Sequence, residues 1–166
     1  MTVAASPAPA SIKTADYVNP IIQSTRDVFE MMLGCVPKRT GLMRKQDANM
    51  PRDISGVIGI SGRTRGTIVL CFPKASALEA LQRMIGTVAT DIDDDVCDAV
   101  GELTNMIAGG AKAQMAHLDL SISLPNIVCG EDHLVRFPAT SVGSIEPFCV
   151  LFDSDLGSFM IEVAFA

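Results

Sequence analysis

The sequence has 166 residues, of which 48% are apolar and 19% charged, and its 19 acidic and 13 basic side chains give a net charge of −6. This length suits a single domain that buries about 70% of its unfolded surface. The acidic balance and the scattered basic residues argue against nucleic acid and anionic membranes as partners. No apolar run approaches the roughly 18 to 20 residues that span a bilayer, and the N-terminus lacks the pattern of a secretory signal. We therefore expect a cytoplasmic protein.

The cysteines and histidines show no pattern of a disulfide framework or a metal site. The five cysteines are odd in number, widely spaced and mostly in apolar surroundings, so we expect buried, reduced thiols. Neither histidine has a partner four residues away or a CxxC motif nearby, which argues against a zinc site. The residues concerned are Cys35, Cys71, Cys97, Cys129, Cys149, His117 and His133.

The first half of the sequence predicts a tail, two helices and a hairpin. Residues 1–16 are rich in Ala, Ser and Pro and are expected to form a flexible tail, so that residues 17–166 form the single domain. Asn19 and Pro20 are typical of a helix start, and Gly34 of a helix end. The next segments are predicted as a strand at 35–40, a loop at 41–52, hairpin strands at 54–60 and 66–72, and a helix at 74–86.

The second half begins with a long helix, predicted over 94–118, and continues with strands. An acidic run from Asp91 to Asp95 precedes the helix, where carboxylates favour the positive end, so we assign the run to capping and give it no catalytic role. The later pattern predicts strands at 122–129, 134–137, 143–152 and 158–165. Helices packed on one mainly antiparallel sheet give an α+β fold.

The two halves share an outline of one major helix followed by strands, which suggests a duplicated helix-plus-strands unit. If Gln23 is set against Glu102, Arg26 falls against Asn105. On this hypothesis the first copy keeps the shape of the second copy and lacks its polar pair.

Residues are unusually distributed around the axis of the long helix. Glu102 and Asn105, one turn apart, fall about 180° from the centre of the apolar stripe and therefore face solvent. Gly101, Gly109 and Ala116 flank them, and small residues leave the helix surface open to close approach by a partner. The expected buried stripe consists of Val96, Val100, Leu103, Ile107, Ala111, Gln114 and Leu118.

Two interpretations of this polar pair are open at this point. An exposed Glu and Asn at this spacing are common on solvated helices and need no function. Against this, asparagine and glycine both weaken a helix interior, and here they concentrate opposite a well-formed apolar stripe. A sequence that gives up helix propensity in one place often keeps a site there.

The stretch GELTNMIAGGAKAQM resembles the signature of the CheC/CheX family of chemotaxis phosphatases, which carry an ExxN motif. The similarity runs from about Tyr17 to the end of the chain, through YVNPIIQSTRDVFEMMLG, DISGVIGISGRTRGTIVLCF, the acidic run and SLPNIVCG. Double-motif CheC proteins have a second ExxN on the first helix, where this sequence has Gln23 and Arg26. The sequence is therefore similar to the single-motif CheX branch.

The resemblance implies dephosphorylation of an aspartyl phosphate on a CheY-like receiver domain, in chemotaxis or another two-component pathway. The receiver brings its own aspartate, Mg²⁺ and lysine, so the protein would need no cofactor of its own. Asn105 is expected to position the attacking water, and Glu102 to pair with the receiver's lysine. The residues expected to contribute to docking are Asp98, Gly101, Gly109 and Lys112.

Two other classes of protein are compatible with these features. A receiver-binding or scaffold module would use the same helix without hydrolysis, and a structural protein related to the flagellar switch would share the architecture. Phosphate release separates the first class from an enzyme, and incorporation into a motor complex would favour the second. By analogy with CheX-like proteins, a homodimer formed through the sheets is also expected.

Overall fold

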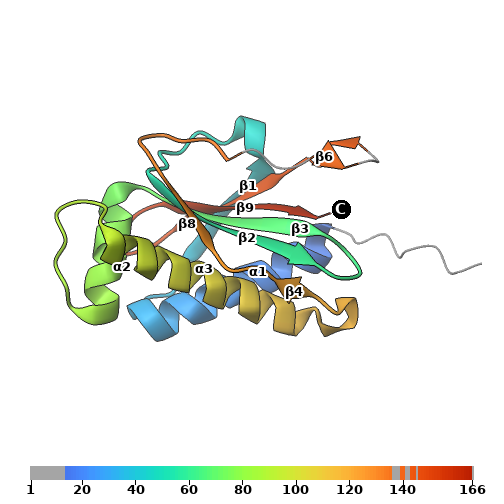
Figure 1. The fold of residues 1–166 in the computed structure, drawn as a ribbon, viewed down its shortest axis with the longest axis horizontal. Coiled ribbons are helices and arrows are strands. Elements are labelled where there is room, and N and C mark those ends of the chain that lie inside the picture. Colours follow the sequence, from blue (N-terminus) through green and yellow to red (C-terminus); the bar gives the residue numbers. More distant parts are fainter. Residues whose placement is uncertain (1–13, 136–138, 141–142, 145, 166) are drawn as a thin grey trace, which may run out of the picture.

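The computed structural model describes residues 14–135, 139–140, 143–144 and 146–165. In this part of the chain, three α-helices lie on one side of an antiparallel sheet (Figure 1). They are α1 (Thr14–Leu33), α2 (Lys74–Ile85) and α3 (Asp94–Gln114). The predicted α+β class, with helices packed on a mainly antiparallel sheet, is confirmed.

The strands of the main sheet are neighbours in an order that differs from their order in the sequence. From one edge to the other they are β1 (Lys38–Arg44), β8 (Phe148–Asp153), β9 (Phe159–Phe165), β3 (Gly66–Phe72), β2 (Ile54–Ser61) and β4 (Ser121–Ile122), with β5 (Asn126–Cys129) also paired to β2. A separate hairpin joins β6 (Ala139–Thr140) to β7 (Gly143–Ser144), and short 3₁₀ turns occupy Lys45–Asp47 and Ala116–Leu118.

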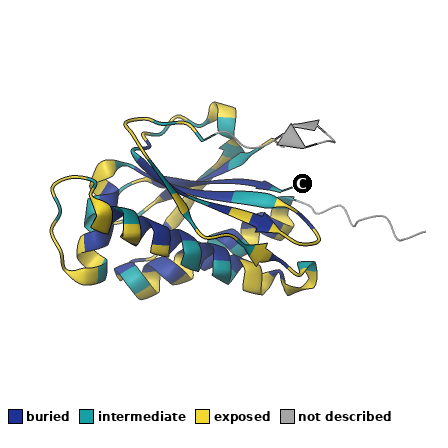
Figure 2. Ribbon diagram, in the orientation of Figure 1, coloured by how far each residue is buried: buried dark blue, intermediate teal, exposed yellow. Residues whose placement is uncertain are grey.

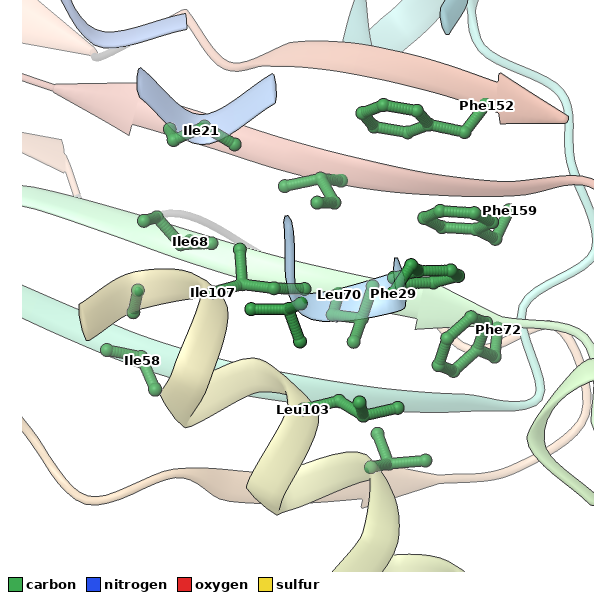
Figure 3. Packing of buried hydrophobic residues seen from close by; sticks show 14 of the residues in the cluster. Ile21, Phe29, Ile58, Ile68, Leu70, Phe72, Leu103, Ile107, Phe152 and Phe159 are labelled. Carbon is green, nitrogen blue, oxygen red and sulfur yellow. The ribbon is translucent and has the colours of Figure 1, made fainter. Parts of the chain in front are cut away.

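The core fills the space between the helices and the facing side of the sheet. Phe159 stacks on Phe29 of α1 with ring centroids 4.7 Å apart and on Phe152 of β8 at 5.0 Å. Figure 3 shows Leu103 and Ile107 of α3 directed into this same core. In Figure 2, α3 is dark blue, and therefore buried, on the side that faces the sheet. Its outer side is teal or yellow, which marks half-buried and exposed residues. The outer side of α3 is therefore the only part of this helix open to a partner.

The first helix begins earlier than predicted, because α1 starts at Thr14 and contains Pro20 in its interior. Residues 14–16, which were assigned to the tail, form its first turn, and residues 1–13 lie outside the described part of the chain. Proline removes one intrahelical hydrogen bond. This loss is offset because Tyr17 and Val18 are buried and the Tyr17 ring stacks on Phe165 at 4.7 Å.

The strand after α1 lies later than predicted. The segment 35–40 was expected to be the strand and 41–52 a loop, whereas β1 runs over Lys38–Arg44. Its sequence is polar because β1 is an edge strand, with one side exposed, and its pairing with β8 is interrupted by a register shift between Arg39 and Gly41. Such an irregularity interrupts the alternation on which strand prediction depends.

The predicted strands of the second half are also divided. The segment 122–129 forms β4 and β5 with a break at Leu124 and Pro125, because proline cannot donate to a sheet ladder. Residues 134–135 form no strand, and 136–137 lie outside the described residues. The segment 143–152 contains β7 and β8, while the hairpin strands 54–60 and 66–72, the helix 74–86 and the last strand agree with β2, β3, α2 and β9 to within one residue.

Among the described residues, none of the helices is long and apolar enough to cross a membrane.

Candidate functional site

The position of α3 is fixed first at its N-terminus. Asp93 is the N-cap, and its carboxylate oxygen accepts a hydrogen bond of 2.9 Å from the backbone N–H of Val96. Asp94 and Asp95 lie in the first turn, where negative charge is favourable. Asp91 instead pairs with Lys74 at 3.0 Å, and this hydrogen-bonded ion pair lowers the pKa of Asp91. The acidic run thus serves capping and local pairing.

Two glycines then let α3 pack closely against its neighbours β2 and α1. Gly56 of β2 lies directly under Thr104, so that a Cβ atom at position 56 would be 2.9 Å from the Cβ atom of Thr104. On the other side, a Cβ atom at Gly110 would be 3.2 Å from that of Ser24, whose hydroxyl donates 2.7 Å to the carbonyl of Ile107. The helix is thereby held against both β2 and α1.

The predicted buried stripe is correct over most of its length and wrong at its end. Val96, Val100, Leu103, Ile107 and Ala111 are buried, as expected. The helix ends at Gln114 instead of 118, since Met115 leaves helical geometry at φ −117° and ψ 38°. Gln114 is consequently exposed, Leu118 is only half-buried, and Met115 occupies the core position.

The outer side of α3 carries a shallow depression of about 420 Å³ beside the polar pair. Glu102 is exposed and Asn105 half-buried, as their opposition to the stripe predicts. Within the described part of the chain, no hydrogen bond or ion pair engages either side chain. The depression is lined by Cys97, Asp98, Gly101, Glu102, Asn105, Leu124, Pro125 and Ile127.

The β4–β5 segment forms the second wall of this depression, which sequence reasoning missed. Pro125 and Ile127 cover Gly101, since a Cβ atom there would lie 3.7 Å and 3.5 Å from their side chains. Gly101 is therefore buried beneath these two side chains. The prediction that it lies on the exposed face of the helix is wrong. Leu124 remains 85% exposed at the rim. The signal available in the sequence was the proline at position 125, which interrupts a predicted strand.

The six predicted site residues fall into two groups along α3. Asp98, Gly101, Glu102 and Asn105 line the same depression. Gly109 and Lys112 instead line a neighbouring depression of about 610 Å³, together with Ala116 and the β4 segment. Both depressions lie along the outer side of one helix, and only the first contains the polar pair.

Charge along this face changes sign from one end to the other. Asp94, Asp98 and Glu102 are exposed on the first half of α3, whereas Lys112 is exposed near its end. The described residues contain no group of three or more side chains suited to hold a metal ion. An exposed carboxylate without its own cation is suited to pair with a cation supplied by another molecule.

Two thiols adjoin the first depression. Cys97 lies two turns before Asn105 on α3, and its Sγ atom is 3.7 Å from that of Cys129 at the end of β5. Burial is the main cause that raises the pKa of Cys97 to about 11. The prediction of buried, reduced thiols holds for Cys35, Cys71 and Cys149, but Cys97 is half-buried and Cys129 exposed.

A third depression, of about 410 Å³, lies on the other side of the sheet, and its charges are engaged internally. Arg52 and Lys45, which line this depression, both pair with the fully buried Glu162, and the Nζ atom of Lys45 lies 2.8 Å from Oε2 of Glu162. A carboxylate that is buried needs cationic partners to compensate its charge, so this group has a structural explanation. This arrangement leaves the outer side of α3 as the functional candidate.

The fold and the site together give an α+β protein in which one rigid helix carries, at its surface, a carboxylate and a carboxamide that have no hydrogen-bond or ion-pair partner among the described residues. A family model described as chemotaxis phosphatase CheX matches residues 54–152. The CheY-P phosphatase CheX of Thermotoga maritima is 31% identical over 125 residues, which cover 74% of this chain and 81% of that protein. The chain belongs to the CheX family of chemotaxis phosphatases.

Solved structures agree with this membership. The chemotaxis protein CheX from Vibrio vulnificus is 33% identical, with a TM-score of 0.82 over 92% of this chain and 100% of that chain. The CheX–CheY–BeF3–Mg²⁺ complex from Borrelia burgdorferi matches at 19% identity and a TM-score of 0.69, over 90% and 97% of the two chains, and shares the fold. The expected family and the expectation of a phosphatase are confirmed.

Proposed function

We propose that this protein removes the phosphoryl group from an aspartyl phosphate on a CheY-like receiver domain, with Asn105 positioning the water and Glu102 aligning the partner. The observation that carries the proposal is that these two side chains line one depression and have no hydrogen-bond or ion-pair partner in the described part of the chain, on a helix whose inner side is buried. Hydrolysis of CheY-P by the Thermotoga relative supports the choice of substrate.

Asn105 has the chemistry that in-line hydrolysis requires. Its carboxamide oxygen accepts a hydrogen bond from water, while its NH₂ group donates to a phosphoryl oxygen. The water oxygen attacks phosphorus, the bond to the receiver's aspartate breaks, and inorganic phosphate and a free carboxylate result. A water that is already held in line with the phosphorus atom does not have to reach this position by chance, which lowers the entropic part of the barrier.

The receiver supplies the rest of the reacting groups in this proposal. Its Mg²⁺ would neutralise charge on the phosphoryl group, and the Borrelia relative is found in a complex with CheY, BeF3 and Mg²⁺. Glu102 accepts hydrogen bonds only when ionised, so it would pair with the receiver's lysine and set the orientation of α3. Asp98 adds negative charge on the same face.

The proposal is tested by phosphate release from receivers of the same organism charged with acetyl phosphate. We expect wild-type protein to accelerate release from at least one receiver. Asn105→Ala should lower the stimulated rate on the order of 10²-fold, because no group remains to hold the water, and should change the unfolding free energy by less than about 0.5 kcal/mol.

Asn19→Ala is the matched control, since Asn19 is an exposed asparagine on α1, away from the depression. It should release phosphate at the wild-type rate. Near-wild-type turnover by Asn105→Ala would remove this residue from the mechanism. Tight binding of phosphorylated receiver by wild-type protein without faster release would identify a non-catalytic binding module instead.

Two further expectations belong to this proposal. We expect the activity in the cytoplasm, as part of a chemotaxis or other two-component pathway. A homodimer would use an open edge of the main sheet, at β1 or at β4 and β5. Light scattering after size-exclusion chromatography measures the mass directly, and a monomer at working concentration would contradict the dimer.

A further inference from the structure

We propose that Cys97 and Cys129 form a reversible disulfide that slows the phosphatase reaction under oxidising conditions. Their Sγ atoms lie 3.7 Å apart although the residues are 32 positions apart in the sequence, on α3 and on β5. This distance corresponds to two thiols in van der Waals contact, with no atom between them. The inference rests on the proposed function for its effect on activity, while formation of the bond is independent of it.

Access and proximity favour the reaction at this pair over the other thiols. Cys129 is exposed and Cys97 half-buried, whereas Cys35, Cys71 and Cys149 are buried. Cys129 is the last residue of β5, a four-residue strand at the sheet edge that pairs with β2 alone among the described strands. A disulfide requires an S–S distance of about 2.05 Å, so a small movement of these two side chains from their separation of 3.7 Å suffices to form the bond.

The oxidant is a hydroperoxide, and the step balances with hydrogen peroxide. The Cys129 thiol first loses its proton, and the thiolate attacks one oxygen, so that the O–O bond breaks and a sulfenic acid and hydroxide form. The hydroxide takes up the released proton and becomes water. The sulfur of Cys97 then attacks Cys129 Sγ, the S–O bond breaks, and a second water leaves with the proton of Cys97. Burial raises the pKa of Cys97, whereas Cys129 is exposed to solvent, so Cys129 is the thiol that meets the peroxide first and Cys97 is the one that completes the disulfide.

The bond would act on the wall of the depression that contains Asn105. Cys97 lines this depression, and Ile127, two residues before Cys129, already covers Gly101 one turn after Cys97. Drawing the end of β5 toward α3 narrows the space beside the polar pair. Since small displacements at a docking site have large effects on turnover, we expect oxidation to lower the receiver dephosphorylation rate on the order of tenfold.

The test treats the reduced full-length protein with hydrogen peroxide, blocks the remaining thiols and measures intact mass, peptide connectivity and phosphate release. The expected result is a loss of two hydrogens, a peptide pair joining positions 97 and 129, a slower rate, and recovery of that rate with dithiothreitol. Cys129→Ser should keep the reduced rate and lose the response. Cys35→Ser, the matched control, should keep the response.

The outcomes separate this inference from the proposed function. Absence of the joined peptides, or a joined protein that works at the reduced rate, overturns the inference. A slower rate that persists in Cys129→Ser also overturns it, because the loss would then come from another oxidation. If the reduced wild-type protein releases no phosphate from any receiver, the proposed function fails, whereas the mass and connectivity still decide whether the disulfide forms.

Discussion

At the scale of single residues, Glu102 and Asn105 belong to one helix turn but are assigned different tasks. Glu102 is exposed, so under the proposed function its carboxylate would steer and align a partner. Asn105 is half-buried and lines the same depression, where a water would be more sheltered. The two residues should therefore be separable by kinetics.

Glu102→Gln preserves size and removes only the charge. We expect its KM for the phosphorylated receiver to rise about threefold to tenfold, with kcat largely retained, because alignment weakens while the water-positioning group remains. The measurement is steady-state phosphate release at two salt concentrations. The KM of the wild type should rise with salt more steeply than that of the variant. Equal KM values for the two proteins would show that Glu102 does not pair with the receiver's lysine.

The polar pair was predictable from the sequence because helical periodicity alone determines which side chains oppose a buried stripe. The burial of Gly101 was not predictable in the same way. It depends on Pro125 and Ile127, which come from a segment more than twenty residues later and reach α3 only through the pairing of β5 with β2. No local pattern specifies that contact.

At the scale of elements, α3 has two adjacent glycines with opposite surroundings. A Cβ atom at Gly109 would meet nothing within 4 Å, whereas one at Gly110 would crowd Ser24 and disturb its hydrogen bond to Ile107. Gly109→Ala should raise the unfolding free energy by about 0.5–1 kcal/mol, and Gly110→Ala should lower it by about 1–3 kcal/mol. Chemical denaturation measures both.

The same pair tests the docking role of Gly109. If Gly109 keeps the helix surface low for a receiver, Gly109→Ala should raise KM despite its greater stability. A variant that is more stable and unchanged in KM would show that this glycine has no part in docking.

The β4–β5 segment presents Leu124 on a rigid support. Ser123 accepts a hydrogen bond from Gly59 N–H and donates one from its backbone N–H to the Gly59 carbonyl, both at 2.9 Å. The exposed Leu124 side chain is thus fixed beside the depression. If the receiver covers it, Leu124→Ser should raise KM about tenfold and leave kcat unchanged.

Leu134→Ser is the matched control for this experiment. Leu134 is 62% exposed and lines the depression on the opposite face of the sheet. Its variant should match wild type in phosphate release, and a similar loss in both variants would indicate a general effect of removing surface leucine.

Elements with one well-defined period were predicted closely, and elements at the sheet edge were not. The hairpin of β2 and β3 and the helix α2 have local signals, namely a short turn and the stop at Gly86, which adopts φ 74°. β1 is polar and contains a register shift, so its identity depends on pairing with β8, more than a hundred residues away. The start of α1 likewise depends on packing of Tyr17 against Phe165.

At the scale of the whole molecule, the sheet separates two environments. Helices and aromatic side chains fill one side, and the other side buries Glu162 with Arg52 and Lys45 near a small apolar cluster that includes Cys71 and Cys149. The sequence could not reveal this charged group, because Arg52 and Glu162 are 110 positions apart.

The two cysteines on that side make the stability of the fold sensitive to alkali. Burial is the main cause that raises the pKa of both thiols to about 12, and the nearby Glu162 carboxylate raises it further, whereas an ordinary thiol has a pKa of 9.0. Below pH 9 both the folded and the unfolded state keep the protons, so stability is unaffected. Between pH 9 and 12 the unfolded chain releases protons that the folded protein retains, which favours unfolding.

The unfolding free energy should therefore fall as pH rises from about 9 to 12, by about 1.4 kcal/mol per pH unit for each fully buried thiol. Urea denaturation at several pH values measures this slope. Cys71→Ala removes one of the thiols whose pKa is raised by burial and should give a shallower slope even though its stability at neutral pH is lower. An identical slope in Cys71→Ala would show that other groups, such as tyrosine or lysine, dominate the alkaline transition.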